Sequence, residues 1–183
     1  RHQARLQAKQ DADTNRTVSH EVFSDKGLAL LPKPSNGDIW FDMEGDPFAL
    51  PPHGLEYLFG TITHDNGSDE FKPFWAHSAE EEKKAFEDFV DWVQGRRKTW
   101  PDLHIYHYAS YERTRITNLA SRFATREAII DDWLRNGLLV DLLKVVQQSI
   151  RVSQRSYSIK KLEPLYDFER DEEVQTAGDS VVD

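Results

Sequence analysis

The chain has 183 residues, of which 38% are hydrophobic and 11% aromatic, so it is long and apolar enough to bury a core and is not a disordered acidic tail. It has no cysteine, which excludes disulfides and thiolate metal sites and favours a cytoplasmic protein. No apolar run approaches the roughly 18 residues that a membrane span needs, so no membrane partner is expected.

The net charge of −9 is unevenly distributed along the chain. Residues 92–161 hold 13 Lys and Arg against 6 Asp and Glu, whereas residues 1–91 hold 9 against 18. A basic middle between acidic flanks permits phosphate contacts with a nucleic acid, although ordinary solvated surface has the same composition. Charge therefore allows a nucleic-acid partner without demonstrating one.

Residues 1–35 are polar and weakly patterned, which predicts a connector or the tail of a preceding domain. The opening residues are rich in Gln, Ala and Arg and have helical character. Residues 28–34 are expected to be extended, because Pro32 and Pro34 disfavour helical geometry in the residues before them. The chain opens without a helix-initiating signal, so we expect a fragment of a longer protein, in which residues 36–183 form one domain.

The most informative stretch is residues 38–47. Within it, apolar side chains alternate with Trp, Asp and Glu, which predicts a strand with one apolar face, ended by Gly45 and Pro47. Asp42 and Glu44 then point to the same side, with Cα atoms about 6–7 Å apart. Two such carboxylates suit a divalent cation in phosphoryl chemistry, whereas the plainer alternative is a strand end that faces water.

Two further strands are expected at residues 56–64 and 70–75, joined by a turn at residues 65–68. The short links between the three strands favour an antiparallel meander. A helix follows, because Ser78 and Glu81 form a capping box ahead of apolar residues at helical spacing. Gly95 is expected to end this helix.

From residue 103 onward, strands alternate with helices. Residues 103–107 and 138–140 are predicted strands, and helices are expected after Ser110, after Thr125 and from Leu142 onward. Residues 158–166 suggest a short helix interrupted by a proline, and the acidic tail from residue 167 suggests irregular structure. This order predicts an α/β fold with a mixed five-stranded sheet, three antiparallel strands followed by parallel ones, flanked by helices.

Polar sites in such sheets collect at the carboxyl ends of strands. Asp42, Glu44, Glu112 and Asp141 all lie at or just beyond predicted strand ends, so we expect them to converge. Asp141 has an alternative role as the cap of the following helix. His107 could reach the same cleft, although a histidine packed at a strand end is the commoner case.

Four segments carry a resemblance to a known family: residues 41–47, 107–112, 139–142 and 158–163. Their order resembles the ribonuclease-H-like DEDD exonuclease superfamily, and within it the predicted nuclease domain of RecB-family proteins. The resemblance runs from residue 38 to the end of the chain. It implies a ribonuclease-H-like fold and a two-metal exonuclease of three-prime to five-prime polarity, acting in DNA repair.

By this resemblance, Asp42 would bridge two Mg²⁺ or Mn²⁺ ions, Glu44 would bind the nucleophile-side ion and Glu112 the other, with Asp141 as a further catalytic residue. The superfamily usually has Asp at the position of Glu112. Its last motif, a Tyr or His followed four residues on by Asp, is not visible before Asp183. We therefore expect a C-terminally incomplete domain, weak or inactive alone, whose partners are nucleic acid and neighbouring RecB-like and helicase-like domains.

Five residues are candidates for contact with nucleic acid. Tyr108 and Tyr111 could stack on bases, and Arg113, Arg115 and Lys160 could touch phosphates. Each also has a plainer explanation as a packed or solvated side chain.

Two other function classes remain beside the nuclease. A non-catalytic module that binds nucleic acid or docks a helicase is favoured by Glu112, by the absent last motif and by the acidic balance. A Tyr-x-x-x-Asp helix beyond residue 183 would favour the enzyme instead. An acid phosphohydrolase would need an Asp-x-Asp pattern, which residues 42–44 do not have.

Overall fold

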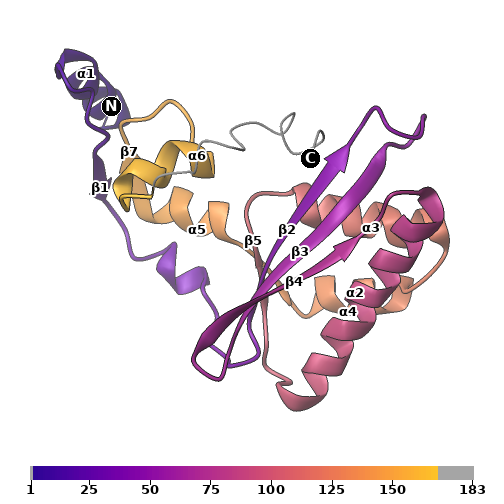
Figure 1. Cartoon of the computed structure of the whole chain (residues 1–183). Coiled ribbons are helices and arrows are strands. Elements are labelled where there is room, and N and C mark those ends of the chain that lie inside the picture. The colour runs from indigo at the N-terminus through magenta and orange to yellow at the C-terminus, as the bar shows by residue number, and fades with distance from the viewer. Residues whose placement is uncertain (1, 169–183) are drawn as a thin grey trace. The chain divides into compact units, whose positions relative to one another are not determined.

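The structure is a computed structural model that describes residues 2–168 (Figure 1). The chain divides into two compact units. The sheet unit is residues 32–141, and the terminal unit combines residues 1–31 with residues 142–183. All four acidic residues of the predicted site lie in the sheet unit.

The sheet unit is built on one five-stranded mixed sheet with the strand order β4-β3-β2-β5-β6. Strands β4, β3 and β2 are antiparallel neighbours, whereas β2, β5 and β6 run parallel. The strands are β2 (Ile39–Asp46), β3 (Leu55–Asp65), β4 (Ser68–Trp75), β5 (Ile105–His107) and β6 (Leu139–Asp141). The predicted α/β fold with its three antiparallel strands and later parallel strands is confirmed.

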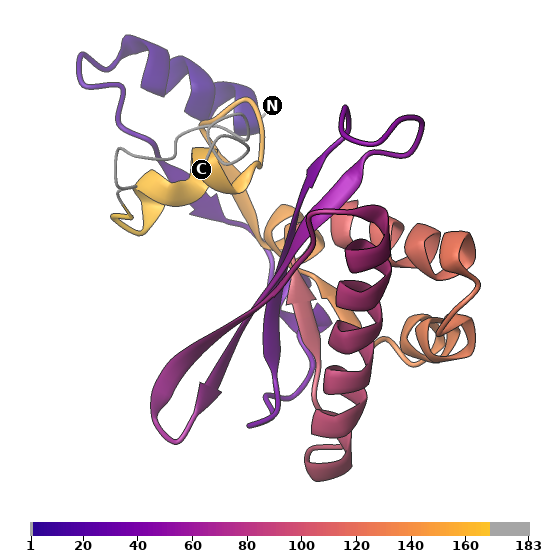
Figure 2. The ribbon, with the colours of Figure 1, turned by 45° about the vertical axis from the view of Figure 1, so that its right-hand side comes forward.

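Three helices cover one face of this sheet (Figures 1 and 2). They are α2 (Ala79–Thr99), α3 (Tyr111–Phe123) and α4 (Glu127–Arg135). The apolar positions of β2 meet them: the rings of Phe41 and Phe89 stack with centroids 4.4 Å apart, and Trp133 packs edge-on against Phe89. Burial of this apolar face is the main source of the unit's stability.

Strand β2 continues further than its sequence predicts. It runs through Gly45 to Asp46, with a register shift between Glu44 and Gly45, so the expected stop at Gly45 is wrong. The physical reason is a close approach: a Cβ on Gly45 would lie 2.3 Å from Oε2 of Glu56 on the paired strand. Because glycine has no side chain, the two strands can approach closely at this position and their pairing continues beyond it.

Helix α2 also extends beyond its expected end. Ser78 caps it as predicted, because its hydroxyl accepts a hydrogen bond from the Glu81 amide. Gly95 does not end the helix, which continues to Thr99. Arg96, the next residue, is held by contacts outside the helix, and such tertiary contacts outweigh the weak helix propensity of one glycine.

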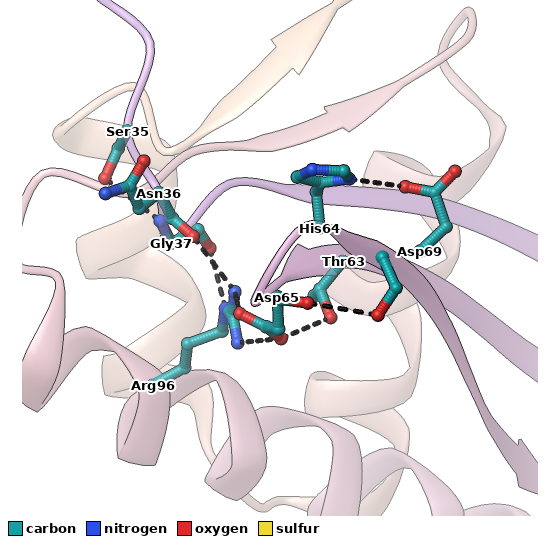
Figure 3. Close-up of polar contacts among 9 residues, drawn as sticks. Ser35, Asn36, Gly37, Thr63, His64, Asp65, Asp69 and Arg96 are labelled. Atoms are coloured by element: carbon teal, nitrogen blue, oxygen red, sulfur yellow. Dashed lines mark hydrogen bonds and ion pairs between the residues drawn. The ribbon is translucent and has the colours of Figure 1, made fainter.

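The Arg96 contacts are drawn in Figure 3. Its guanidinium donates to both carboxylate oxygens of Asp65, at 2.9 and 2.8 Å, and its Nε donates to the Gly37 carbonyl at 2.8 Å. Thr63 donates a further hydrogen bond to Asp65. The Arg96 side chain is only 7% exposed. It therefore ties the turn between β3 and β4 to the segment that leads into β2.

Helix α4 begins at Glu127, two residues beyond Thr125, which was expected to open it. Thr125 does not open the helix: its hydroxyl donates to the Glu87 carboxylate at 2.6 Å. Arg126 occupies the cap position in a left-handed conformation, and its guanidinium donates to Asp91. Side-chain contacts with α2 therefore decide where α4 starts.

The terminal unit contains a two-stranded antiparallel sheet of β1 and β7 that its sequence did not predict, because three-residue strands show too little alternation. Its elements are α1 (His2–Ala12), β1 (His20–Val22), η1 (Leu28–Leu30), α5 (Leu142–Ser149), β7 (Ile150–Val152), α6 (Ile159–Leu162) and η2 (Glu163–Leu165). Residues 28–30 form a 3₁₀ turn, so the expectation of an extended segment is wrong there.

The 3₁₀ turn has a local cause. Gly27 packs so closely on α5 that a Cβ would lie 2.1 Å from the Ser149 hydroxyl, and its carbonyl accepts a hydrogen bond from Leu30. The prolines act only on residues that come after this turn. The expected irregular tail lies outside the described residues beyond residue 168. No helix among residues 2–168 is both long and apolar enough to cross a membrane.

Candidate functional site

Asp42 and Glu44 lie on the face of β2 opposite to the apolar core. Asp42 pairs with Gly60 and Glu44 with Leu58 on β3, and the buried Met43 between them points the other way. The Asp42 carboxylate accepts a hydrogen bond from the Met43 amide at 3.1 Å. Both carboxylates therefore share one face of the sheet, as the alternation predicts.

Glu112 reaches Asp42 from the first turn of α3. The two carboxyl groups are in hydrogen-bond contact, and Glu44 adds a further negative charge nearby. Burial of the Asp42 carboxyl, the hydrogen bond from Glu112 and repulsion by Glu112 and Glu44 raise the pKa of Asp42 from 3.8 to about 6. Asp42 is exposed as a whole residue, so the dehydration concerns its carboxyl end where Glu112 covers it.

His107 lies behind Glu112, away from water. Its Nδ1 is 3.4 Å from Oε2 of Glu112, and the side chains are 1% and 4% exposed. Neither ring nitrogen of His107 nor this oxygen has a hydrogen-bond partner among residues 2–168. Buried polar atoms normally have such partners, so this pair marks a place where a proton, a water or a cation would be bound favourably.

Asp141 supports the loop that leads into α3. Its Oδ1 accepts a hydrogen bond from the amide of Ala109 at 3.0 Å, and it stands opposite His107 in the parallel register of β5 and β6. Ala109 has a positive φ of 74°, a strained geometry for a non-glycine residue. Asp141 thus fixes the backbone three residues before Glu112.

The chemistry of Asp42, Glu44 and Glu112 fits a hard divalent cation, because carboxylate oxygens are the ligands that Mg²⁺ and Mn²⁺ prefer. Oε2 of Glu112, which accepts no hydrogen bond from residues 2–168, is available as a metal ligand. However, no group of three or more His, Asp and Glu side chains within residues 2–168 is arranged so that it could hold a metal ion. Metal binding would require the Asp42–Glu112 hydrogen bond to open as the carboxyls lose their shared proton.

A second cluster of buried acids lies beside the first and was missed in the sequence. Glu56 and Glu82 are 5% and 1% exposed. Glu82 accepts a hydrogen bond from the Glu56 amide at 2.8 Å and pairs with Arg122, while Glu56 pairs with Arg115 at 3.0 Å. These four side chains line a pocket of about 420 Å³. No sequence pattern separates these glutamates from the exposed ones around them.

The candidate nucleic-acid contacts are in different surroundings. Tyr111 is 38% exposed, donates its hydroxyl hydrogen bond to Glu56 and lies under the guanidinium of Arg115, 5.0 Å from the ring centroid. Arg113 is exposed on α3, and Tyr108 is half-buried in the loop after β5. Lys160 belongs to α6 of the terminal unit and is exposed. Their roles remain predictions.

Comparisons with known proteins give one match. The family model of the RNase H superfamily matches residues 39–182. This span begins at the first residue of β2 and includes all four predicted acidic residues. No curated protein and no solved structure matches the chain. The matched span covers most of the chain and agrees with the mixed five-stranded sheet. The chain therefore belongs to the RNase H superfamily.

Proposed function

We propose that this chain carries the metal-binding site of a divalent-cation-dependent nuclease, with Asp42, Glu44 and Glu112 as the ligands. The observation that carries the proposal is the contact between the carboxyls of Asp42 and Glu112, residues 70 positions apart, beside Glu44. Such crowding of acids opposes folding unless protons or cations neutralise it. Membership of the RNase H superfamily supports a nucleic acid as substrate.

Each residue has a part that follows from its position. Asp42 and Glu44 supply oxygens from a rigid strand, and Glu112 supplies oxygens from the start of α3. Asp141 is a positioning residue, because it holds the Ala109 amide. When bound, two divalent ions in such a site would activate a water and stabilise the leaving oxygen of a phosphodiester. His107 lies buried beside the Glu112 carboxylate, with its Nδ1 3.4 Å from Oε2.

The finer assignment follows the DEDD and RecB-family resemblance. We propose three-prime to five-prime trimming of single-stranded ends with Mg²⁺ or Mn²⁺, within a larger cytoplasmic DNA-repair protein that has RecB-like and helicase-like domains. Tyr108, Tyr111, Arg113, Arg115 and Lys160 would contact the nucleic acid. Exposed Arg113 is suited to a phosphate, because its side chain is directed to solvent from α3.

The proposal is tested by Mn²⁺ binding to the 183-residue chain at pH 7.5, above the pKa of about 6 for Asp42. Mn²⁺ should raise the melting temperature, because a ligand that binds only the folded state stabilises it. Asp42→Asn should abolish the rise, whereas Glu70→Gln, which removes an exposed carboxylate from β4, should retain it. No Mn²⁺-dependent rise in the unchanged protein would contradict the metal site.

A non-catalytic nucleic-acid-binding or helicase-docking module is the second candidate. It is favoured by the lack of an arranged group of metal ligands in residues 2–168. Such a module would bind a single-stranded oligonucleotide equally well with EDTA and with Mn²⁺. A nuclease site would bind it more tightly with Mn²⁺, because cations that join the carboxylates to a phosphate strengthen the contact. The same titration in both buffers separates the two candidates.

A further inference from the structure

We infer that Glu56 and Tyr111 are positioning residues that hold Glu112 against Asp42. This inference rests on the proposed metal site and adds to it two residues that would act on Glu112 without touching the ions. They act through the first turn of α3, the element that carries Glu112.

The contact between them is direct and well oriented. The Tyr111 hydroxyl donates to Oε2 of Glu56 at 2.9 Å, and the other oxygen of Glu56 faces Nε of Arg115 at 3.0 Å. The guanidinium of Arg115 also lies over the Tyr111 ring. Glu56 is 5% exposed, so its charge has little water and depends on these donors. The three side chains thus fix one another.

This contact reaches the predicted ligands from two directions. Tyr111 directly precedes Glu112, and Glu56 pairs with Gly45, the residue after Glu44. A Cβ on Gly45 would lie 2.3 Å from Oε2 of Glu56 and 2.8 Å from the Tyr111 hydroxyl. Gly45 of β2, at the register shift between β2 and β3, and the start of α3 therefore meet at the same hydrogen bond, which sets the distance between the strand and the helix.

The first turn of α3 is not held by a side-chain cap. Ser110 occupies the cap position but its side chain makes no capping hydrogen bond. The loop before it is held through the Ala109 amide by Asp141, on the side away from β2. The Tyr111–Glu56 bond attaches the first turn of α3 to β3, the strand that pairs with β2, next to the contact between Glu112 and Asp42. Partners of this kind, which orient a ligand without touching the metal, typically change metal affinity by about 10–100-fold.

The test compares Mn²⁺ affinity among single variants, measured from the free Mn²⁺ signal in electron paramagnetic resonance. Tyr111→Phe removes only the hydroxyl and should weaken Mn²⁺ binding about tenfold. Tyr106→Phe is the matched control and should leave Mn²⁺ binding unchanged. It also removes one tyrosine hydroxyl, but this hydroxyl faces the Asp38 carboxylate, at 3.4 Å, and not Glu56. Glu56→Ala should weaken binding as Tyr111→Phe does, whereas Glu56→Gln, which keeps a polar partner for Tyr111, should largely restore it.

Metal-free unfolding of each variant separates positioning from folding. A loss of affinity in Tyr111→Phe with unchanged metal-free stability and restored affinity in Glu56→Gln supports the inference. Equal affinity in Tyr111→Phe and the unchanged protein overturns it, while the proposed metal site would stand. If the unchanged protein binds no Mn²⁺, the proposed function itself is wrong and this inference falls with it.

Discussion

Replacing Asp42 with Asn should stabilise the metal-free protein at neutral pH. Asp42 carries a pKa of about 6 because its carboxyl is dehydrated and lies against Glu112 and Glu44. At pH 7 the folded protein must therefore hold a charge where its surroundings disfavour it. Asn keeps the shape of the side chain and an oxygen for the Met43 amide, but it has no charge to hold.

The size of the effect follows from the pKa. A rise from 3.8 to about 6 corresponds to about 3 kcal/mol of lost stability above pH 6, at about 1.36 kcal/mol for each pKa unit. Asp42 is exposed as a residue, so water screens part of this repulsion and we expect about 1–2 kcal/mol. The folded protein binds the proton more tightly than the unfolded chain, so the stabilising contribution of protonation is complete below pH 3.8 and is lost as the pH rises through 6.

The assay is urea unfolding in EDTA at several values between pH 4 and pH 7. The free-energy difference between Asp42→Asn and the unchanged protein should grow with pH and level off above about pH 6. Glu70→Gln, which changes an exposed residue of β4, is the matched control and should show no such growth. A difference that is absent at pH 7, or that is constant over the whole range, would refute the explanation by crowded carboxyls.

Two other predictions concern contacts that stabilise the sheet unit. Gly45→Ala should lower the free energy of unfolding by about 1–3 kcal/mol, because its Cβ would overlap Glu56; denaturant unfolding measures this, and an unchanged midpoint would contradict the close approach. Arg96→Ala should cost about 3–5 kcal/mol, because it leaves Asp65 without its main partner in a half-buried position. Since Arg96 lowers the pKa of Asp65, that contribution is present above pH 3.8 and is lost on acidification, so the cost of Arg96→Ala should shrink as the pH falls below that value.

Local pattern was sufficient to predict the parts of the fold that depend on near neighbours in sequence. The alternation in residues 39–44 predicted both the strand β2 and the shared direction of Asp42 and Glu44, because side chains in a strand point alternately to opposite faces. The capping box at Ser78 and Glu81 likewise predicted the start of α2. Predicting that Glu112 meets Asp42 required one more step, the rule that sites lie at the carboxyl ends of parallel strands.

The failures have a common physical cause, which is contact between segments far apart in sequence. Gly45 was expected to end a strand, yet it lies against Glu56 of the paired strand. Gly95 was expected to end a helix, yet the helix continues through Arg96, which contacts Gly37 and Asp65. The buried Glu56 and Glu82 were missed for the same reason. Their burial depends on ion pairs with Arg115 and Arg122, which lie in α3, far from both glutamates in sequence.

In the proposed site, the contacts of Glu112 explain how a glutamate could take the place of the aspartate that DEDD exonucleases usually have. Its carboxyl touches Asp42 on one side and faces His107 on the other, so the extra methylene is used to cross from α3 to β2. Tyr111 and Glu56 set the separation that has to be crossed. A glutamate on a helix that lies farther from the strand and an aspartate on a helix that lies closer to it can place a carboxylate oxygen at the same point. On this view the side-chain length at residue 112 and the Glu56–Tyr111 contact act together. The role of either cannot be understood from the carboxylates of the proposed site alone.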